Sequence, residues 1–265
     1  MTPVYLSIAG SDCSAGAGLQ ADLKTGFALG CYPLTAVTCV VSEVPGEVEG
    51  IVAMEPAFVA DQVRICLRNF PVAAIKTGML YSPEIVQAVT GELKEYTGPL
   101  VVDPVMIATA GEPLMLQAAI SVYEQNLMPK TTLLTPNLDE LLKLLGTSAT
   151  ICNTTELQQA ATTLARRYNC AVLAKGGHLV GDTCTDILVE PSGTAYQWEH
   201  PRTYGISTHG TGCTLSSAIA AHLALGHPLI DAVDLSLRYI AKAIAGSHRL
   251  GKHWAVNHHG AITQF

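Results

Sequence analysis

The sequence is poor in charge and has no long apolar run. Charged residues fill 14% of its 265 positions, and no 18 consecutive residues are all apolar. Low charge places much of the chain in an interior or an interface, and the missing apolar run predicts no membrane-spanning helix. The net charge of −7 and the pI of about 5.7 argue against a nucleic-acid partner. The first five residues have neither a basic region nor an apolar core, so we expect no secretion signal.

Motifs of several enzyme and metal-site classes are also absent. The eight cysteines are scattered without a Cys-x-x-Cys pair, which predicts reduced thiols and a cytoplasmic protein rather than a disulfide framework or a zinc site. Neither a Gly-x-x-x-x-Gly-Lys-Ser/Thr loop nor a Gly-x-Ser-x-Gly elbow occurs, which disfavours P-loop nucleotidases and serine hydrolases. His253, His258 and His259 have no cysteine or carboxylate neighbours, and we interpret them as part of a solvated tail rather than as metal ligands.

Apolar segments with strand and helix spacing alternate along the chain, which is 49% hydrophobic with a mean hydropathy of +0.31. Strands are predicted at residues 4–9, 34–41, 73–75, 100–103, 133–135 and 171–174, a β-hairpin at 183–189 and 194–198, and helices at 19–29, 56–69, 83–96, 138–145, 155–168, 214–226 and 229–245. This alternation predicts an α/β fold, a doubly wound and mostly parallel central sheet with helices on both faces. No linker or repeat interrupts it, so we expect one domain over residues 1–265.

A glycine-rich turn at residues 207–213 opens directly onto the helix predicted at 214–226. It contains Thr208, Gly210, Thr211 and Gly212 and ends at Cys213. The N–H groups at a helix N-terminus lack intrahelical partners, and the helix dipole is positive there, so the turn is predicted to bind an anion. Cys213 would lie beside the anion, where a helix end lowers the pKa of a thiol. The alternative is a loop that only caps a buried helix.

Polar residues and glycines follow the other predicted strands as well. Ligands bind at the carboxyl ends of the strands in doubly wound sheets, a rule that selects Gly10, Val41, Glu43, Lys76, Met79, Asp103, Asn137 and Lys175 besides the turn. Lysines and carboxylates at one edge of a sheet fit an anionic, phosphorylated ligand with a divalent cation better than a neutral ligand.

Two of these features also have purely structural interpretations. Asn137 and Glu140, three residues apart at a helix start, form either a capping box or a water-mediated magnesium site near nucleotide phosphates. Lys76 and Lys175 each end an apolar strand and could simply snorkel to solvent. The two glycines after Lys175 allow a ligand to approach the backbone, which favours this lysine as a phosphate contact.

Residues 16–21 resemble a dinucleotide-binding fingerprint, with Glu43 placed to bind a ribose. The glycines of that fingerprint follow their strand directly, whereas six residues separate Gly16 from Ala9. A dinucleotide-binding oxidoreductase is therefore a distant alternative.

Seven motifs, taken in order, are similar to those of the hydroxymethylpyrimidine/phosphomethylpyrimidine kinases of thiamine biosynthesis, in the ribokinase-like superfamily. They lie at residues 8–12, 16–25, 76–80, 102–106, 135–140, 175–178 and 208–214. The resemblance covers nearly the whole chain. It implies ATP-dependent phosphorylation of a hydroxymethyl group and then of the phosphate so formed.

The resemblance also implies the roles of the site residues. Cys213 replaces the usual aspartate base and accepts or positions the hydroxyl proton, while Gly210, Thr211 and Gly212 hold the transferring phosphoryl group. Substrate binding is implied for Gly10, Asp22, Val41, Glu43 and Met79, ATP binding for Asp103, Asn137, Lys175 and Thr208, and Mg²⁺ binding for Asp103 and Glu140. The resemblance further suggests a homodimer.

The chain departs from the family pattern at two places. Glu43 stands where the family usually has glutamine, and an ionised carboxylate accepts hydrogen bonds but donates none. It would suit a ring-protonated aminopyrimidine or another heteroaromatic alcohol such as pyridoxal, unless it points to solvent. Ile206 and Ser207 replace a Lys-Asn pair, which puts one nucleotide contact in question. A pyridoxal-type kinase and a non-catalytic vitamer-binding protein therefore stay open as alternatives.

Overall fold

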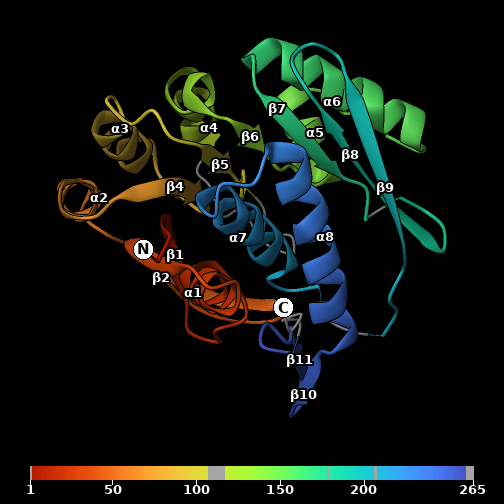
Figure 1. The fold of residues 1–265 in the computed structure, drawn as a ribbon, viewed down its shortest axis with the longest axis horizontal. Helices are drawn as coiled ribbons and strands as arrows, with labels where there is room; N and C mark the ends of the chain where they lie inside the picture. Colours follow the sequence, from red (N-terminus) through yellow and green to blue (C-terminus); the bar gives the residue numbers. More distant parts are fainter. Residues whose placement is uncertain (1, 107–116, 178, 206–207, 261–265) are drawn as a thin grey trace.

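A computed structural model describes residues 2–106, 117–177, 179–205 and 208–260. Nine of its strands form one sheet (Figure 1). Across the sheet they are β3 (Glu47–Ala53), β2 (Tyr32–Val44), β1 (Val4–Asp12), β4 (Val72–Thr77), β5 (Leu100–Val102), β6 (Leu133–Leu134), β7 (Ala171–Lys175), β8 (Thr183–Val189) and β9 (Ala195–Pro201). Six neighbouring strands are parallel to one another: β2, β1, β4, β5, β6 and β7. At one edge β3 adds an antiparallel strand, and at the other edge β8 and β9 do so. The predicted mostly parallel sheet and the β8–β9 hairpin are confirmed.

Helices cover both faces of the sheet, which explains why its central strands are apolar throughout. Successive side chains of a strand point to opposite faces, so Leu100 and Val102 of β5 belong to one buried cluster and Val101 to the other. One face is covered by α2 (Pro56–Asn69), α3 (Pro83–Glu92), α4 (Gln117–Asn126), α5 (Leu138–Leu145) and α6 (Thr154–Tyr168), and the other by α1 (Gly18–Ala28), α7 (Thr211–Ala224) and α8 (Leu229–Ala245) (Figure 1). The doubly wound arrangement is confirmed.

Several elements differ from the sequence prediction. The sequence does not predict β3, in which no side chain is buried and whose apolar run, residues 51–53, is short. The helix α4 has a short apolar face around Ala119, Ile120 and Tyr123. A 3₁₀ helix, Met128–Lys130, follows it. The strands β1 and β2 extend beyond their predicted ends to Asp12 and Val44, and the helix predicted at 83–96 ends at Glu92.

The interpretation of the last described residues as a solvated tail is wrong. They form a small antiparallel hairpin, β10 (His248–Leu250) and β11 (His253–Ala255). His258, which follows it, is only 6% exposed, although its neighbour His259 is exposed. Isolated histidines carry no periodic signal, so the sequence does not distinguish a packed segment from a free tail.

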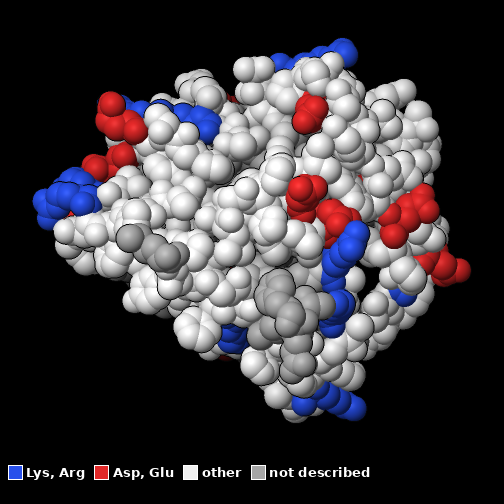
Figure 2. All heavy atoms as spheres, viewed as in Figure 1, with Lys and Arg blue, Asp and Glu red and all other residues white. Residues whose placement is uncertain are grey.

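Most of the surface seen in Figure 2 is uncharged, and its acidic and basic side chains are scattered. Within the described ranges, no helix is both long enough and apolar enough to cross a membrane. The parallel strands β1, β2, β4, β5, β6 and β7 end at the same edge of the sheet. The residues that follow them gather there and form the candidate site.

Candidate active site

The glycine-rich turn begins α7, with Gly210 as the residue before its first turn. Gly210 has a φ of +79°, and a Cβ atom built on it would lie 1.8 Å from the carbonyl oxygen of Gly16. Only glycine fits this position, because the conformation is left-handed and another backbone occupies the space. The turn after β1 and the turn before α7 are therefore in direct contact. We call residues 210–213, at the start of α7, the cradle. Anion binding by N–H groups there stays a prediction.

A lysine–aspartate pair lies against this cradle. Lys175 Nζ is 3.1 Å from Asp103 Oδ1, and a Cβ atom built on Gly212 would lie 3.3 Å from the same Nζ. Thr135 and Ser216 also donate hydrogen bonds to the Asp103 carboxylate. Burial opposes the charge of Lys175, but Asp103 and Glu140 outweigh it and raise the lysine pKa. Lys175 is thus a partly exposed cation beside the cradle, as expected of a phosphate contact.

Asn137 and Glu140 form the capping box that was one of the two interpretations. The Asn137 side chain accepts from the N–H of Glu140, and Glu140 Oε2 accepts from the N–H of Asn137, both at 2.9 Å. Glu140 is nevertheless only 3% exposed and lies close to Lys175 and Asp103. Burial raises the pKa of its carboxyl to about 7, and Lys175 opposes that rise. Capping does not exclude a second role of Glu140 in ligand binding, because the same carboxyl lies close to Lys175 and Asp103.

Cys213 lies in the first turn of α7, and the predicted lowering of its pKa is wrong. Burial raises the pKa of the thiol to about 12 and outweighs the opposing effects of Lys76 and of the Gly18 N–H group. Burial and the nearby carboxylates of Asp22 and Asp103 disfavour the thiolate more than Lys76 and the Gly18 N–H group favour it. At neutral pH Cys213 is therefore a thiol, a hydrogen-bonding group rather than a strong base.

Lys76 does not snorkel to solvent. It is fully buried and forms an ion pair with Asp22 of α1, with Nζ 2.8 Å from Oδ2 and 3.0 Å from Oδ1. Ser7 and Ser217 donate further hydrogen bonds to the same carboxylate. Asp22 has no exposed surface, which disfavours direct contact of its carboxylate with a substrate, and the predicted substrate-binding role is not tested by this structure. The pair instead lies within electrostatic range of Cys213.

Asp12, which the sequence prediction places at this edge of the sheet without a role, connects the two turns. Its carboxylate accepts from the N–H groups of Gly16 and Ala17 at 3.0 and 2.7 Å and lies 3.0 Å from His209 Nε2. Burial opposes its ionisation, but these bonds lower the pKa to about 2. The glycine N–H groups that a dinucleotide pyrophosphate would need are therefore occupied, which argues against the oxidoreductase alternative.

Glu43 belongs to this end of the site and is half-buried rather than directed into solvent. Burial and the nearby Asp12 raise the pKa of its carboxyl, and His209 opposes that rise. Its backbone is fixed by Cys13, whose sulfur accepts from the N–H of Glu43 at 3.4 Å and donates to its carbonyl at 3.3 Å. The charged neighbours place the Glu43 side chain near the two glycine turns.

An apolar cluster adjoins Glu43. Val41 and Met79 pack with Cys39, and a Cβ atom on Gly10 would lie 2.8 Å from Cys39 Sγ and 3.6 Å from Met79 Sδ. The predicted substrate residues Gly10, Val41 and Met79 are thus brought together. Apolar side chains beside a carboxyl group suit a flat heteroaromatic ring with polar edge groups.

Other predicted positions are less informative. Thr208 is exposed beside the cradle, and its contact with ATP stays a prediction. Ile206, Ser207 and His178 lie outside the described residues. The described part of the chain contains no cluster of three or more His, Cys, Asp and Glu side chains placed to bind a metal ion.

The sequence is similar to those of known kinases of thiamine biosynthesis, which agrees with the geometry of the candidate site. It is 43% identical over 256 residues to the thiamine biosynthesis bifunctional protein ThiED of Geobacter sulfurreducens, covering 96% of this chain and 51% of that one. It is 38% identical over 250 residues to a hydroxymethylpyrimidine/phosphomethylpyrimidine kinase of Rhizobium meliloti, covering 94% and 93%. The chain thus spans about half the length of the first relative and most of the second.

Solved structures agree as well. The pyridoxal kinase of Staphylococcus aureus in complex with AMP-PCP and pyridoxal superimposes with a TM-score of 0.88 at 30% identity, covering 98% of this chain and 94% of that one. The phosphomethylpyrimidine kinase of Clostridium difficile gives 0.80 at 36% identity, covering 92% and 100%. A model of the phosphomethylpyrimidine kinase family matches residues 12–258, and the chain belongs to that family.

Proposed function

We propose that the protein is an ATP-dependent kinase that phosphorylates 4-amino-5-hydroxymethyl-2-methylpyrimidine and then its monophosphate. One observation carries this proposal. The cradle at the start of α7 lies against the Lys175–Asp103 pair, and an apolar cluster with a carboxyl group lies near the same turns. Phosphoryl transfer depends mainly on positioning and charge stabilisation, and this arrangement provides an anion site next to a place for an aromatic ring.

The cradle, Lys175 and Cys213 have different roles in phosphoryl transfer. The N–H groups of the cradle stabilise charge on the transferring phosphoryl group, and Lys175 neutralises charge on the ATP phosphates. The Cys213 thiol, which is protonated at neutral pH, orients the substrate hydroxyl by hydrogen bonding. A loose transition state requires little proton removal before the bond forms, so a positioned thiol suffices in place of the usual aspartate.

The residues at this edge fit Mg²⁺ bound together with a nucleotide. Mg²⁺ is held by one or two carboxylates, several waters and substrate phosphates, and Asp103 and Glu140 are the two carboxylates beside Lys175. When bound, the ion neutralises charge on the ATP phosphates. The absence of a three-ligand cluster in the described residues agrees with an ion that arrives with its nucleotide.

A pyridoxal-type kinase is the second candidate, and Glu43 is the observation that favours it. The TM-score with the pyridoxal kinase, 0.88, exceeds that with the phosphomethylpyrimidine kinase, 0.80, whereas the sequence identity is lower, 30% against 36%. Glu43→Gln restores the side chain that pyrimidine kinases of this family usually carry, so it is expected to lower KM for the hydroxymethylpyrimidine and leave KM for ATP unchanged. If the wild-type chain turns over pyridoxal faster than both pyrimidine substrates, the pyridoxal function replaces the pyrimidine one.

The decisive assay couples ADP formation to each of the three substrates. Cys213→Ala is expected to lose most of kcat while ATP binding, measured by calorimetry, is retained. Undiminished turnover in that variant removes the proposed role of the thiol. No ADP formation with any substrate supports the alternative of a non-catalytic vitamer-binding protein.

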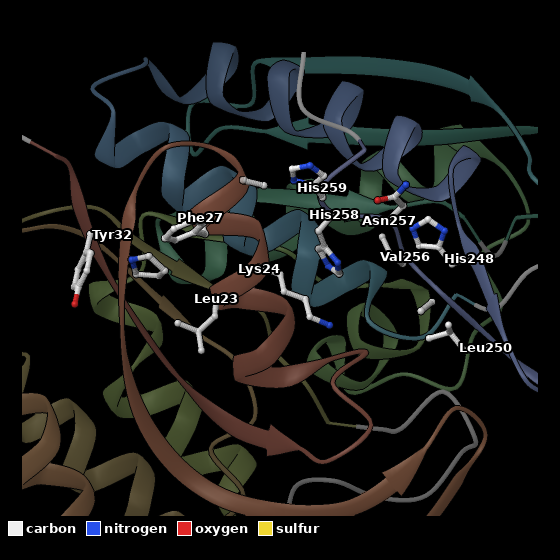
Figure 3. A pocket seen from close by; sticks show the side chains of 13 residues that line it. Leu23, Lys24, Phe27, Tyr32, His248, Leu250, Val256, Asn257, His258 and His259 are labelled. Carbon is white, nitrogen blue, oxygen red and sulfur yellow. The ribbon is translucent and has the colours of Figure 1, made fainter. Parts of the chain in front are cut away.

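The chain is further proposed to act in the cytoplasm as a homodimer. Exposed apolar side chains of α1, β2 and the C-terminal hairpin, namely Leu23, Phe27, Tyr32 and Leu250, surround a hollow of about 900 Å³ (Figure 3). Apolar patches of this kind commonly mark interfaces between subunits. Light scattering coupled to size-exclusion chromatography gives the mass directly, and a monomer at micromolar concentration contradicts the dimer.

A further inference from the structure

The segment after β11 is anchored to α8 by its backbone. The Tyr239 hydroxyl donates to the carbonyl oxygen of His258 at 2.9 Å, and the N–H of Asn257 donates to the carbonyl of Ala243 at 3.1 Å. Figure 3 shows the His258 ring beside Lys24 of α1, whereas His259 points the opposite way. The buried His258 side chain is thus held between α1, α7 and α8.

The His258 ring contacts the start of α7. Its Nε2 lies 3.0 Å from Thr214 Oγ1, and Thr214 Oγ1 also lies 2.8 Å from the carbonyl oxygen of Gly210. The hydroxyl and the neutral imidazole each have one hydrogen, so either Nε2–H donates to Thr214 Oγ1 while the hydroxyl donates to Gly210, or the hydroxyl donates to Nε2 while Nδ1–H faces the Val256 carbonyl. The N–H of Thr214 donates to the same Gly210 carbonyl at 2.9 Å. The ring is therefore linked through Thr214, by two successive hydrogen bonds, to the residue that begins the cradle.

The role of this contact is geometric. Burial and the nearby Lys24 lower the pKa of His258 to about 4, against a small opposing effect of the Val256 carbonyl, so the ring is neutral at neutral pH. Lys24 in turn donates to the carbonyl of Ala15 at 2.6 Å. Lys24 thus contacts the turn after β1, and His258 contacts the start of the cradle through Thr214.

We propose that His258 is a positioning residue for the cradle. Its ring holds Thr214, Thr214 holds the Gly210 carbonyl, and the peptide groups of residues 210–213 are thereby fixed with their N–H groups in the orientation that phosphoryl transfer requires. This inference rests on the proposed function of the cradle. It assigns a catalytic contribution to a part of the chain that does not itself touch the reacting atoms.

The test uses four single variants and one pair in the full chain. His258→Phe keeps the ring volume and removes Nε2, and Thr214→Val removes the hydroxyl on the other side of the same bond. His258→Gln restores an amide N–H at the position of Nε2. His259→Phe, at the exposed neighbour, is the matched control. Each is assayed for kcat and KM for ATP at a temperature where circular dichroism shows it folded, and amide hydrogen exchange of the peptide covering residues 210–216 is followed by mass spectrometry.

His258→Phe and Thr214→Val are each expected to lower kcat by about 2- to 10-fold, the value of one hydrogen bond. KM for ATP should stay unchanged and exchange in the 210–216 peptide should become faster. The double variant should be no worse than the poorer single one, because both changes remove the same bond. His258→Gln should recover most of kcat, and His259→Phe should match the wild type.

The inference is overturned if His258→Phe lowers the melting temperature while kcat and exchange in the cradle keep their wild-type values, since His258 would then only stabilise the fold. It is equally overturned if the His258→Phe and Thr214→Val effects add. Failure of the proposed function gives a different result: the wild-type chain forms no ADP with any substrate. The exchange measurement still decides whether His258 holds the turn.

Discussion

Lys76 of β4 and Asp22 of α1 form an ion pair with no exposed surface, 2.8 Å from Nζ to Oδ2, next to the thiol of Cys213. A Cβ atom on Gly78 would lie 2.9 Å from the Lys76 ammonium, so the glycine after the strand leaves room for the charge. Lys76→Met removes the cation and leaves a buried carboxylate unpaired. The expected loss is about 3–5 kcal/mol of unfolding free energy, measured by urea denaturation.

Arg64 provides the matched control for this prediction. It pairs with Asp61 and Glu92 on the surface, so Arg64→Ala is expected to cost no more than about 1 kcal/mol. Combining Lys76→Met with Asp22→Asn should recover part of the loss, because no uncompensated charge is then buried. Equal costs for Lys76→Met and Arg64→Ala would show that the buried pair contributes no more than an exposed one.

Gly210→Ala tests the contact between the two glycine turns. Gly146 ends α5 with a φ of +70° and has no atom within 4 Å of a Cβ built on it, whereas Gly210 would meet the Gly16 carbonyl. Gly146→Ala should therefore cost only the left-handed strain of about 1–2 kcal/mol and leave kcat unchanged. Gly210→Ala should cost more and lower kcat about 100-fold, since the cradle must shift. Similar kcat values for the two variants would contradict a tight cradle.

The reactivity of Cys213 follows from its raised pKa. A thiol with a pKa of about 12 forms almost no thiolate at pH 7.5. Iodoacetamide should therefore modify the exposed Cys13 and Cys152 well before Cys213, as followed by mass spectrometry of tryptic peptides. Preferential labelling of Cys213 would show that the helix end dominates over burial after all.

Glu43 makes stability depend on pH. Its pKa is raised by burial and by Asp12, so the folded state favours the protonated carboxyl. The contribution of Glu43 to stability is therefore fully present below the ordinary glutamate pKa of about 4.3 and is lost as the pH rises through the folded value. Glu43→Gln should melt at a higher temperature than the wild type at pH 7, and the difference should shrink as the pH approaches 4. A constant difference from pH 4 to 8 would contradict the raised pKa.

The strands and the cradle could be predicted from the sequence because their signals are local. Short apolar runs bounded by glycine mark β4, β5 and β7, and the residues that follow each strand reach one edge by the geometry of parallel sheets. Asp103, Glu140, Lys175 and residues 210–213 therefore come together as expected.

The errors concern burial, which depends on contacts between distant parts of the chain. Lys76 and Asp22 are 54 residues apart, and nothing near either one in the sequence indicates a partner. The pKa of Cys213 likewise depends on how much water the surrounding elements exclude. The sequence alone predicts that His258 lies in a solvated tail, whereas α1, α7 and α8 bury it in the folded protein.

The carbonyl of Gly16 fills the space that a side chain at position 210 would need, and this has a consequence for chimaeric proteins. The two loops are far apart in the sequence, yet the backbone of one fills the space beside the other. Exchanging one of them with a distant homologue should give an inactive hybrid, whereas exchanging both together should preserve turnover. The two segments are thus expected to be inherited as one unit.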